Sequence, residues 1–395
     1  MKRFFLYTLI SFFLLLLSAG QASANSNDSI RLSLLTCAPG EEIYSLFGHT
    51  AIRYENPSQG IDAVFNYGLF SFNTPNFIFR FSLGETDYQL GVTDYEHFAA
   101  EYGFYGRSVW QQTLNLTDEE KTKLIQLLQE NYRPENRVYR YNFFYDNCAT
   151  RPRDKIEESI AGKVVYPAEP QDGSRTFRDI VHQYCKGHPW ARFGIDLCIG
   201  SEADQPITQR QMMFAPFYLM DAFDGAQIKN GSIQRPLITS NKLVVDATPE
   251  PNESGWIPTP LQCSLLLFIL TAAATIYGIR RRTGLWGIDL FFFGMAGIVG
   301  CVLAFLALFS QHPAVSSNFL LLVFHPGQLL LLPYIIYCVR KGKKCWYLTL
   351  NLVVLTLFIV LFPVIPQRFD FAVVPLALVL LIRSASNLIV TSKKK

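Results

Sequence analysis

The sequence predicts an exported α+β domain followed by an all-α membrane bundle of about five helices. Three observations support this fold class: a signal-like N-terminus, a mixed and aromatic-rich first half, and an almost wholly apolar second half. The predicted parts are a signal peptide (1–24), an exported domain (25–245), a proline-rich linker (246–260), a transmembrane domain (261–390) and a basic cytoplasmic tail (391–395).

The N-terminus has the three parts of a signal peptide. Lys2 and Arg3 form the charged region, residues 4–17 are apolar, and Ala22-Ser23-Ala24 has the small-x-small pattern of a cleavage site. The apolar run is shorter than the roughly 20 residues of a bilayer span, although an uncleaved anchor stays an open alternative. Gln21 stands where a lipoprotein would carry its lipidated cysteine, so we do not expect the chain itself to be a lipoprotein.

The exported half alternates strand and helix patterns. Residues 51–54 and 62–70 are β-branched or aromatic runs around a turn-forming segment, which predicts a β-hairpin. Thr117 and Glu120 have the spacing of a capping box, which predicts a helix ending near Asn131. The remaining predicted elements are strands at 107–116 and 138–145 and a helix at 154–160.

The apolar half divides into about five predicted spans, at roughly 261–279, 287–309, 319–339, 346–365 and 371–390. Lysines and arginines cluster at alternate ends of successive spans, at 280–282, 340–344 and 393–395. The positive-inside rule makes these ends cytoplasmic. The exported domain is therefore predicted on the periplasmic (outer) side of a multi-pass protein of the cytoplasmic (inner) membrane, in agreement with the signal peptide.

Composition excludes several classes of function. The formal charge of +3 arises largely from basic membrane flanks, so nothing supports binding to nucleic acid. No cysteine pair has the short Cys-x₂₋₄-Cys spacing of a structural zinc site, and no Gly-x-Ser-x-Gly elbow is present. We expect neither a metal nor another cofactor. Of the eight cysteines, Cys185 and Cys198 have a spacing that permits a disulfide, but sequence alone does not decide connectivity.

His49 and Cys148 are the candidate catalytic residues. His49 opens a strand-like run, and Cys148 lies between a predicted strand and a predicted helix. A thiol becomes a strong nucleophile when a base removes its proton, and imidazole is the usual base. The alternative is a buried or disulfide-bonded cysteine and a packed histidine. Asn147 is placed to cap the following helix, whereas Pro152 favours a later helix start that leaves Cys148 in a turn.

The order of His49 and Cys148 along the chain resembles that of a known group of enzymes. A histidine on a strand before a cysteine that leads into a helix resembles circularly permuted papain-like (NlpC/P60-type) enzymes, and Asn147-Cys148 is similar to lecithin–retinol acyltransferase-type proteins of that group. The chain resembles more closely the Lnb-type bacterial lipoprotein N-acyltransferases, which combine an exported cysteine domain with membrane helices. The resembling segments are 37–44, 45–53, 66–68, 141–154, 213–216 and 311–313.

This resemblance implies transfer of an acyl chain from a phospholipid to the N-terminal amine of a diacylated apolipoprotein. Cys148 would carry the acyl group as a thioester, and His49 would act as base and acid. The predicted supporting residues are Asn66 (orienting the imidazole), Tyr44 and Ser45 (hydroxyl groups), Arg53 (a phosphate site) and Asn147, with His312 on the membrane side. For Tyr44, Ser45, Arg53 and His312, a purely structural role is the alternative, and Asn66 is alternatively a surface or turn asparagine.

Two other functions stay open at this point. An exported cell-wall cysteine peptidase or amidase would use the same residues but needs no multispan region, so the predicted spans favour a lipid substrate. A non-enzymatic, membrane-tethered envelope protein would have Cys148 in a disulfide. The spans themselves serve either as a passive anchor or as walls of a lipid-accessible groove, and one helix would suffice for anchoring.

Overall fold

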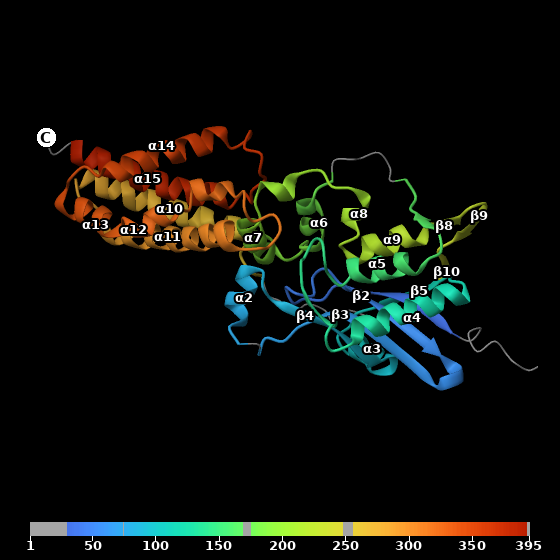
Figure 1. Cartoon of the computed structure of the whole chain (residues 1–395). Helices are drawn as coiled ribbons and strands as arrows, with labels where there is room; N and C mark the ends of the chain where they lie inside the picture. The colour runs from blue at the N-terminus through green and yellow to red at the C-terminus, as the bar shows by residue number, and fades with distance from the viewer. Residues whose placement is uncertain (1–29, 74, 169–174, 248–255, 393–395) are drawn as a thin grey trace, which may run out of the picture.

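The computed structural model describes residues 30–73, 75–168, 175–247 and 256–392. The predicted signal peptide and part of the predicted linker (248–255) lie outside these described residues. Figure 1 shows a domain built on a β-sheet and, beside it, an elongated helical bundle that contains the C-terminal part of the chain. This arrangement agrees with the predicted α+β domain followed by an all-α region.

An antiparallel sheet of seven strands forms the centre of the first domain, in the order β10-β5-β1-β2-β3-β4-β6. These strands are β1 (Arg31–Cys37), β2 (His49–Asn56), β3 (Ile61–Leu69), β4 (Asp87–Asp94), β5 (Val109–Leu114), β6 (Val138–Arg140) and β10 (Ile238–Val245). A smaller sheet contains β7 (Lys163–Val165), β8 (Gln227–Asn230) and β9 (Ile233–Pro236). The predicted hairpin is confirmed as β2 and β3.

Helices cover both faces of the large sheet. On one face Phe98 and Tyr102 of α3 (Tyr95–Phe104) pack against buried residues of β1, β2 and β3. On the other face α4 (Asp118–Tyr132), α5 (Thr150–Ser159) and α9 (Pro216–Asp224) contribute to the main core. Figure 1 shows α3 and α5 on opposite sides of the strands. The remaining helices are α2 (Phe77–Leu83), α6 (Phe177–Tyr184), α7 (Pro189–Cys198), α8 (Gln209–Met212) and the 3₁₀ turns η1 (Pro57–Gln59) and η2 (Ser201–Asp204).

Two local predictions have different outcomes. The capping box of Thr117 and Glu120 is present in both directions, and α4 ends at Tyr132, so this helix is confirmed. The strand predicted at 138–145 is wrong beyond Arg140, where β6 ends. Asn142 and Asp146 form an isolated bridge across a turn, and Phe144 packs with α6 and α8 instead of extending the sheet. An aromatic run can be buried either in a strand of the sheet or in a turn packed against helices, so its hydrophobicity did not distinguish the two.

The bundle contains α10 (Pro260–Arg280), α11 (Trp286–Phe309), η3 (Phe319–Leu322), α12 (Pro326–Leu330), α13 (Leu332–Lys341), α14 (Trp346–Leu361) and α15 (Val373–Ser392). The predicted span 319–339 is broken, because α13 is bent by 75° from the segment before it. Pro326 lies at the start of α12 and Pro333 in the first turn of α13. The ring of a proline and its missing N–H interrupt a continuous helix at these points. Pro363 likewise ends α14 before the predicted 365.

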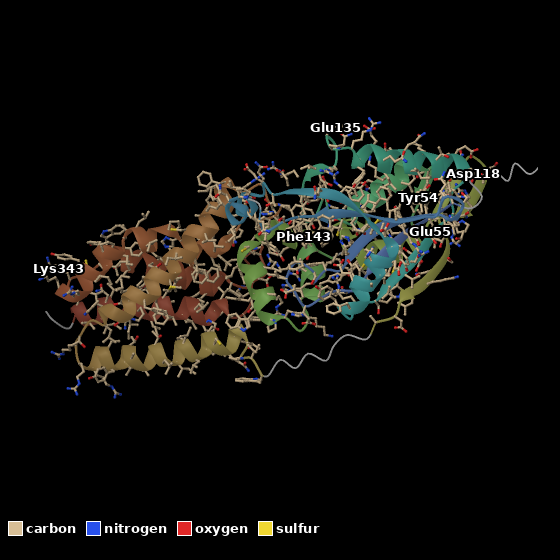
Figure 2. The ribbon with its side chains drawn as sticks, turned by 90° about the horizontal axis from the view of Figure 1, so that it is seen from below. Tyr54, Glu55, Asp118, Glu135, Phe143 and Lys343 are labelled. Carbon is tan, nitrogen blue, oxygen red and sulfur yellow. The ribbon has the colours of Figure 1, made fainter. Side chains whose placement is uncertain are left out.

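Three of the described helices, α10, α11 and α15, are long and apolar enough to cross a membrane, and the bent segment gives a fourth if it counts as one span. The helix α14 is apolar but shorter, so five spans stay a prediction. Figure 2 shows Lys343, from one basic cluster, at the end of the bundle farthest from the sheet domain. This placement agrees with the orientation derived from the positive-inside rule.

Several contacts join the sheet domain to the bundle, and two of them show the difference in their chemistry. At the first, Arg368 pairs with Asp179 at 2.6 Å and with Asp204 at 2.9 Å. At the second, the ring of Phe79 on α2 lies 5.9 Å from that of Phe305 on α11. Near it, the backbone N–H of Gln311 donates to Leu83 at 2.8 Å. Together these contacts orient the sheet domain relative to the bundle.

Candidate active site

His49 is the first residue of β2, and the backbone before it is tightly constrained. Gly48 has φ +77°, a conformation that favours glycine, and a Cβ there would lie 2.5 Å from the carbonyl oxygen of Cys37. His49 then pairs with Cys37 of β1 in the sheet register. The glycine therefore lets the chain enter the sheet at this point, with the imidazole half-buried at the end of the strand.

Asn66 of β3 lies beside the imidazole, and its role in orienting the ring stays a prediction from the sequence. Its Oδ1 lies 3.3 Å from Nε2 of His49. Its Nδ2 faces two oxygens, Oγ1 of Thr93 at 3.2 Å and the carbonyl of Val64 at 3.5 Å. Because a carbonyl only accepts, the amide nitrogen must face Val64 and the amide oxygen must face His49. Nε2 of His49 therefore carries the proton, and Nδ1 is the basic nitrogen.

Cys148 lies in the turn before α5, and Asn147 holds that turn. Oδ1 of Asn147 accepts from the backbone N–H groups of Ala149 (2.8 Å) and Thr150 (2.9 Å), which is the predicted capping role. Its Nδ2 donates to the carbonyls of Phe143 (2.8 Å) and Phe214 (2.9 Å). The regular helix begins at Thr150, two residues after the cysteine. Asn147 thus fixes the position of Cys148 between the sheet and α5.

The sulfur of Cys148 lies beside the start of β2. The backbone N–H groups of Thr50 and of Cys148 itself point at the sulfur. Thr50 follows His49 directly, so the histidine and the cysteine lie at the same end of the sheet. In the described part of the chain no hydrogen bond joins the two side chains, and both are half-buried. Catalytic hydrogen bonds often form only when substrate is bound, so the lack of this bond does not argue against a thiol–imidazole pair.

Burial keeps both groups neutral at physiological pH. It lowers the pKa of His49 to about 4; the Asn66 hydrogen bond opposes this change, and the charge of Arg107 adds to it. Burial also raises the pKa of the Cys148 thiol to about 11, against the opposing effect of the two backbone N–H groups. The resting site is therefore a thiol beside a neutral imidazole, and the imidazole is free to act as a general base.

Two predicted supporting residues have structural partners instead. Arg53 donates to both carboxylate oxygens of Asp62, at 2.8 and 2.7 Å, and to Gln111 at 2.7 Å. Its guanidinium also lies 3.3 Å from the centre of the Tyr95 ring. The structure therefore gives Arg53 the ion-pair role. Ser45 is buried, and its hydroxyl donates to the carbonyl of Glu42 at 2.9 Å, so it closes a local turn.

Tyr44 and His312 lie on the side facing the bundle. Tyr44 is exposed, and its ring packs against Phe70 and Phe72. His312 contacts Phe81 of α2 through its ring and through Nε2, which faces the Phe81 carbonyl. Among the contacts of the described residues, none joins Tyr44 or His312 to His49 or Cys148. Tyr44 therefore lies on the exposed surface around α2, and His312 lies where α2 meets the loop after α11.

Sequence reasoning did not identify the residues that surround the thiol. A Cβ on Gly68, which has φ +92°, would lie 3.5 Å from the Cβ of Cys148 and 3.8 Å from the ring of Tyr141. Tyr141 stacks on Tyr88 with ring centres 4.2 Å apart. The segments 66–68 and 141–154 had been noted for their resemblance, but these contacts depend on how β3 and β4 pair. Cys148 thus has an aromatic wall on one side.

All eight cysteines are free thiols, so the disulfide considered between Cys185 and Cys198 is not formed. Cys37 is fully buried beside His49, and burial raises its pKa to about 12. Cys148 is half-buried, and its sulfur faces the backbone N–H of Thr50, the residue after His49. This arrangement identifies Cys148, and not Cys37, as the candidate nucleophile.

The end of the sheet that carries the site faces the bundle. Figure 2 shows Tyr54 and Glu55, at the opposite end of β2 from His49, on the far side of the domain. It shows Phe143, whose carbonyl accepts from Asn147, between those residues and the bundle. The candidate site therefore lies toward the end of the domain that faces the bundle.

Comparison with known families agrees with this division into two regions. The model of the Lnb N-terminal periplasmic domain matches residues 20–182, and that of the Lnb transmembrane domain matches residues 252–395. None of the curated proteins or solved structures compared with the chain matches it. The two matches indicate an inner-membrane protein with a periplasmic N-terminal domain. Because both domain models match in succession, the chain belongs to the Lnb family, in agreement with the lipoprotein N-acyltransferase resemblance of its motifs.

Proposed function

We propose that this chain is a membrane-bound lipoprotein N-acyltransferase. It moves an acyl chain from a phospholipid to the N-terminal amine of a diacylated apolipoprotein, through a thioester on Cys148. The observation that carries the proposal is the convergence of Cys148, His49 and Asn66 at the membrane-facing end of the sheet. Family membership and the attached bundle support a lipid substrate.

In the first step, Nδ1 of His49 takes the thiol proton and the sulfur of Cys148 attacks the ester carbonyl carbon of the phospholipid. A C–S bond forms and the ester C–O bond breaks. The imidazolium of His49 returns the proton to the leaving oxygen, which departs as the hydroxyl of a lysophospholipid. The acyl group is then held as a thioester, and the imidazole is neutral again.

In the second step, the neutral N-terminal amine of the apolipoprotein attacks the thioester carbonyl. A C–N bond forms and the C–S bond breaks, while His49 accepts a proton from the amine and passes it to the departing sulfur. The products are an N-acylated lipoprotein and the free thiol. His49 works in both steps as a neutral base, which its low pKa permits at physiological pH.

The oxyanion formed in each step needs hydrogen-bond donors near the sulfur. Asn147 already occupies the backbone N–H groups of Ala149 and Thr150. The N–H groups of Cys148 and Thr50 point instead at the reacting atom. We assign these two N–H groups as the oxyanion donors. Each is expected to lower the activation free energy by about 3 kcal/mol in a preorganised site.

The test is acyl transfer in reconstituted membranes. Vesicles containing the full chain are incubated with a diacylated lipopeptide, and the mass of the lipopeptide is followed. The wild type is expected to add one acyl chain, and Cys148→Ala is expected to abolish this addition. Cys198→Ala, a half-buried cysteine elsewhere in the domain, serves as the matched control. If Cys148→Ala still triacylates the lipopeptide, the mechanism is wrong.

A second readout separates this function from the other two. The acyl-enzyme is expected as a mass increase of one acyl chain on the Cys148 peptide when no lipopeptide is present, and hydroxylamine is expected to remove it. Release of peptide fragments from purified murein, lost in Cys148→Ala, would instead favour a cell-wall peptidase. A non-enzymatic role would leave both assays unaffected by the substitution.

A further inference from the structure

An exposed aromatic surface surrounds α2. We call it the α2 surface and define it by its exposed members, Tyr44 (61%), Phe72 (63%), Ile78 (80%), Phe79 (59%) and Phe81 (46%). The partly buried ring of Phe77 connects them, with centres 5.1 Å from Phe72 and 6.0 Å from Phe81. No residue of α2 is buried. Contiguous apolar surface of this kind marks a contact with a partner or a membrane.

The opposite side of α2 is fixed by polar contacts. Arg80 pairs with Asp87 of β4 at 2.6 Å, and its guanidinium also donates to the carbonyl of Glu85. A Cβ on Gly84 would lie 2.8 Å from the backbone nitrogen of His312, so the end of α2 fits closely against the loop after α11. The helix is therefore held in place while its aromatic side stays exposed.

The α2 surface is continuous with the outer end of the bundle. Phe79 contacts Phe305, and Phe309, one turn further along α11, is 64% exposed. Figure 1 shows α2 beside the end of the bundle that faces the sheet domain. Lys343 marks the other, cytoplasmic end. The α2 surface thus lies at the level where the outer leaflet meets water, which is where aromatic side chains collect.

The same surface leads to the thiol through successive aromatic contacts. Phe77 stacks on Phe70 with centres 5.8 Å apart, and Phe70 lies 5.1 Å from Tyr88. Tyr88 stacks on Tyr141, which lies beside Gly68 together with Cys148. A series of aromatic contacts therefore extends from the α2 surface to Tyr141, which lies on the same side of Gly68 as the candidate nucleophile.

We propose that the α2 surface inserts into the outer leaflet of the membrane and receives the acyl chain of the phospholipid donor, which reaches Cys148 along Phe70, Tyr88 and Tyr141. The occupant is a bilayer phospholipid, because the surface continues onto the lipid-facing side of α11 and its exposed members carry no charge. The insertion is independent of the proposed function. The delivery of the acyl chain to Cys148 rests on the proposed acyltransferase function.

Insertion is tested by photo-crosslinking in proteoliposomes of phosphatidylethanolamine and phosphatidylglycerol. The photoreactive residue p-benzoylphenylalanine replaces Ile78 in one protein and Phe104 in another, and adducts are identified by mass. Phe104 at the end of α3 is the matched control, because it is 79% exposed and is not part of the α2 surface. Phospholipid adducts are expected at position 78 and not at 104. Crosslinks to a second copy of the protein, or equal labelling at both positions, would overturn the proposal.

Delivery is tested with Ile78→Glu and its control Phe104→Glu. A carboxylate is costly in the apolar part of the interface, so Ile78→Glu is expected to slow acyl transfer from vesicle phospholipid about tenfold. Phe104→Glu is expected to match the wild type. Alkylation of Cys148 by water-soluble iodoacetamide should be the same in both, which shows an intact site.

The two proposals fail in distinguishable ways. If the wild type transfers no acyl chain but lipid adducts form at position 78, the proposed function is wrong and insertion stands. If acyl transfer proceeds and Ile78→Glu leaves its rate unchanged, delivery across the α2 surface is wrong and the acyltransferase stands.

Discussion

The sheet domain and the bundle use polar residues in different ways. In the sheet domain, His49 and Cys148 stay half-buried, and nitrogen Nδ1 and the thiol are left for substrate. In the bundle, an acidic and a basic side chain are buried and paired with each other. Asp289 and Arg383 form a two-point ion pair at 2.7 and 3.0 Å, and Thr275 accepts from the same guanidinium at 3.0 Å.

This difference separates the residues that are available for reaction from those that hold the helices together. A charge in a membrane is tolerated where it is neutralised, and Asp289 and Arg383 are each only 2% exposed. Their contacts hold α11 and α15 together and leave nothing for a substrate. The half-buried pair of the sheet domain is less stabilising but is available for reaction. We infer that the bundle contributes position and lipid access, whereas the reacting groups belong to the sheet domain.

The largest expected effect comes from breaking the bundle's ion pair. Arg383→Ala leaves the carboxylate of Asp289 buried and unpaired, which is expected to destabilise the protein by about 3 kcal/mol. The measurement is thermal or denaturant unfolding in detergent. The double variant Asp289→Leu/Arg383→Met should recover most of the loss, because it removes both charges and keeps the volume.

The acyl-transfer activity of the double variant is the second part of this test. Per folded molecule, the double variant is expected to transfer acyl chains at nearly the wild-type rate. A stable double variant without activity would contradict the division between support and chemistry, because it would place a bundle charge in the reaction.

The second effect is the pH dependence of thiol reactivity. With a pKa of about 11, the thiolate fraction of Cys148 rises about tenfold per pH unit below that value. Alkylation of the Cys148 peptide by iodoacetamide is therefore expected to accelerate about a hundredfold from pH 7 to pH 9, without a plateau. A plateau near neutrality would instead indicate a thiolate–imidazolium pair in the resting protein.

The third effect concerns the orienting residue. Asn66→Ala removes the acceptor of the His49 Nε2 proton, and acyl transfer is expected to fall about tenfold to thirtyfold. Asn66→Asp keeps an oxygen toward His49, and its charge favours the imidazolium, so the pKa of His49 should rise. The acidic limb of the pH–rate profile should then move to higher pH in Asn66→Asp. An unmoved limb would mean that Asn66 only packs beside the ring.

Sequence reasoning succeeded where chemistry or local pattern was decisive. The hairpin of β2 and β3, the capping box of α4 and the capping role of Asn147 each depend on residues within a short stretch of chain. The types and order of His49 and Cys148 predict a thiol–imidazole site, because few other residues can perform that chemistry, and this site stays a prediction. Asn66 followed from its position on the strand paired with β2.

The remaining features depend on contacts that no local pattern records. The α2 surface meets the loop after α11 more than two hundred residues away along the chain. The aromatic wall requires Phe70, Tyr88 and Tyr141 to adjoin across strands whose register was not predicted. Arg53 was left between a phosphate site and an ion pair, because the sequence did not show that its guanidinium is shared between Asp62 of β3 and Gln111 of β5, a strand that does not neighbour β2.

The smallest expected effect is at Tyr44, whose hydroxyl the sequence offered as a supporting group. The ring packs against Phe70 and Phe72, at 6.1 and 6.2 Å between centres, and the side chain is 61% exposed. Tyr44→Phe keeps the ring and removes the hydroxyl, so acyl transfer should change less than about twofold. Tyr44→Glu keeps a polar group and places a charge on the α2 surface, so it should slow transfer from vesicles more than Tyr44→Phe does. If Tyr44→Phe proves the more damaging, the hydroxyl takes part in the reaction, and the reacting groups extend beyond His49, Asn66 and Cys148 onto the surface that faces the membrane.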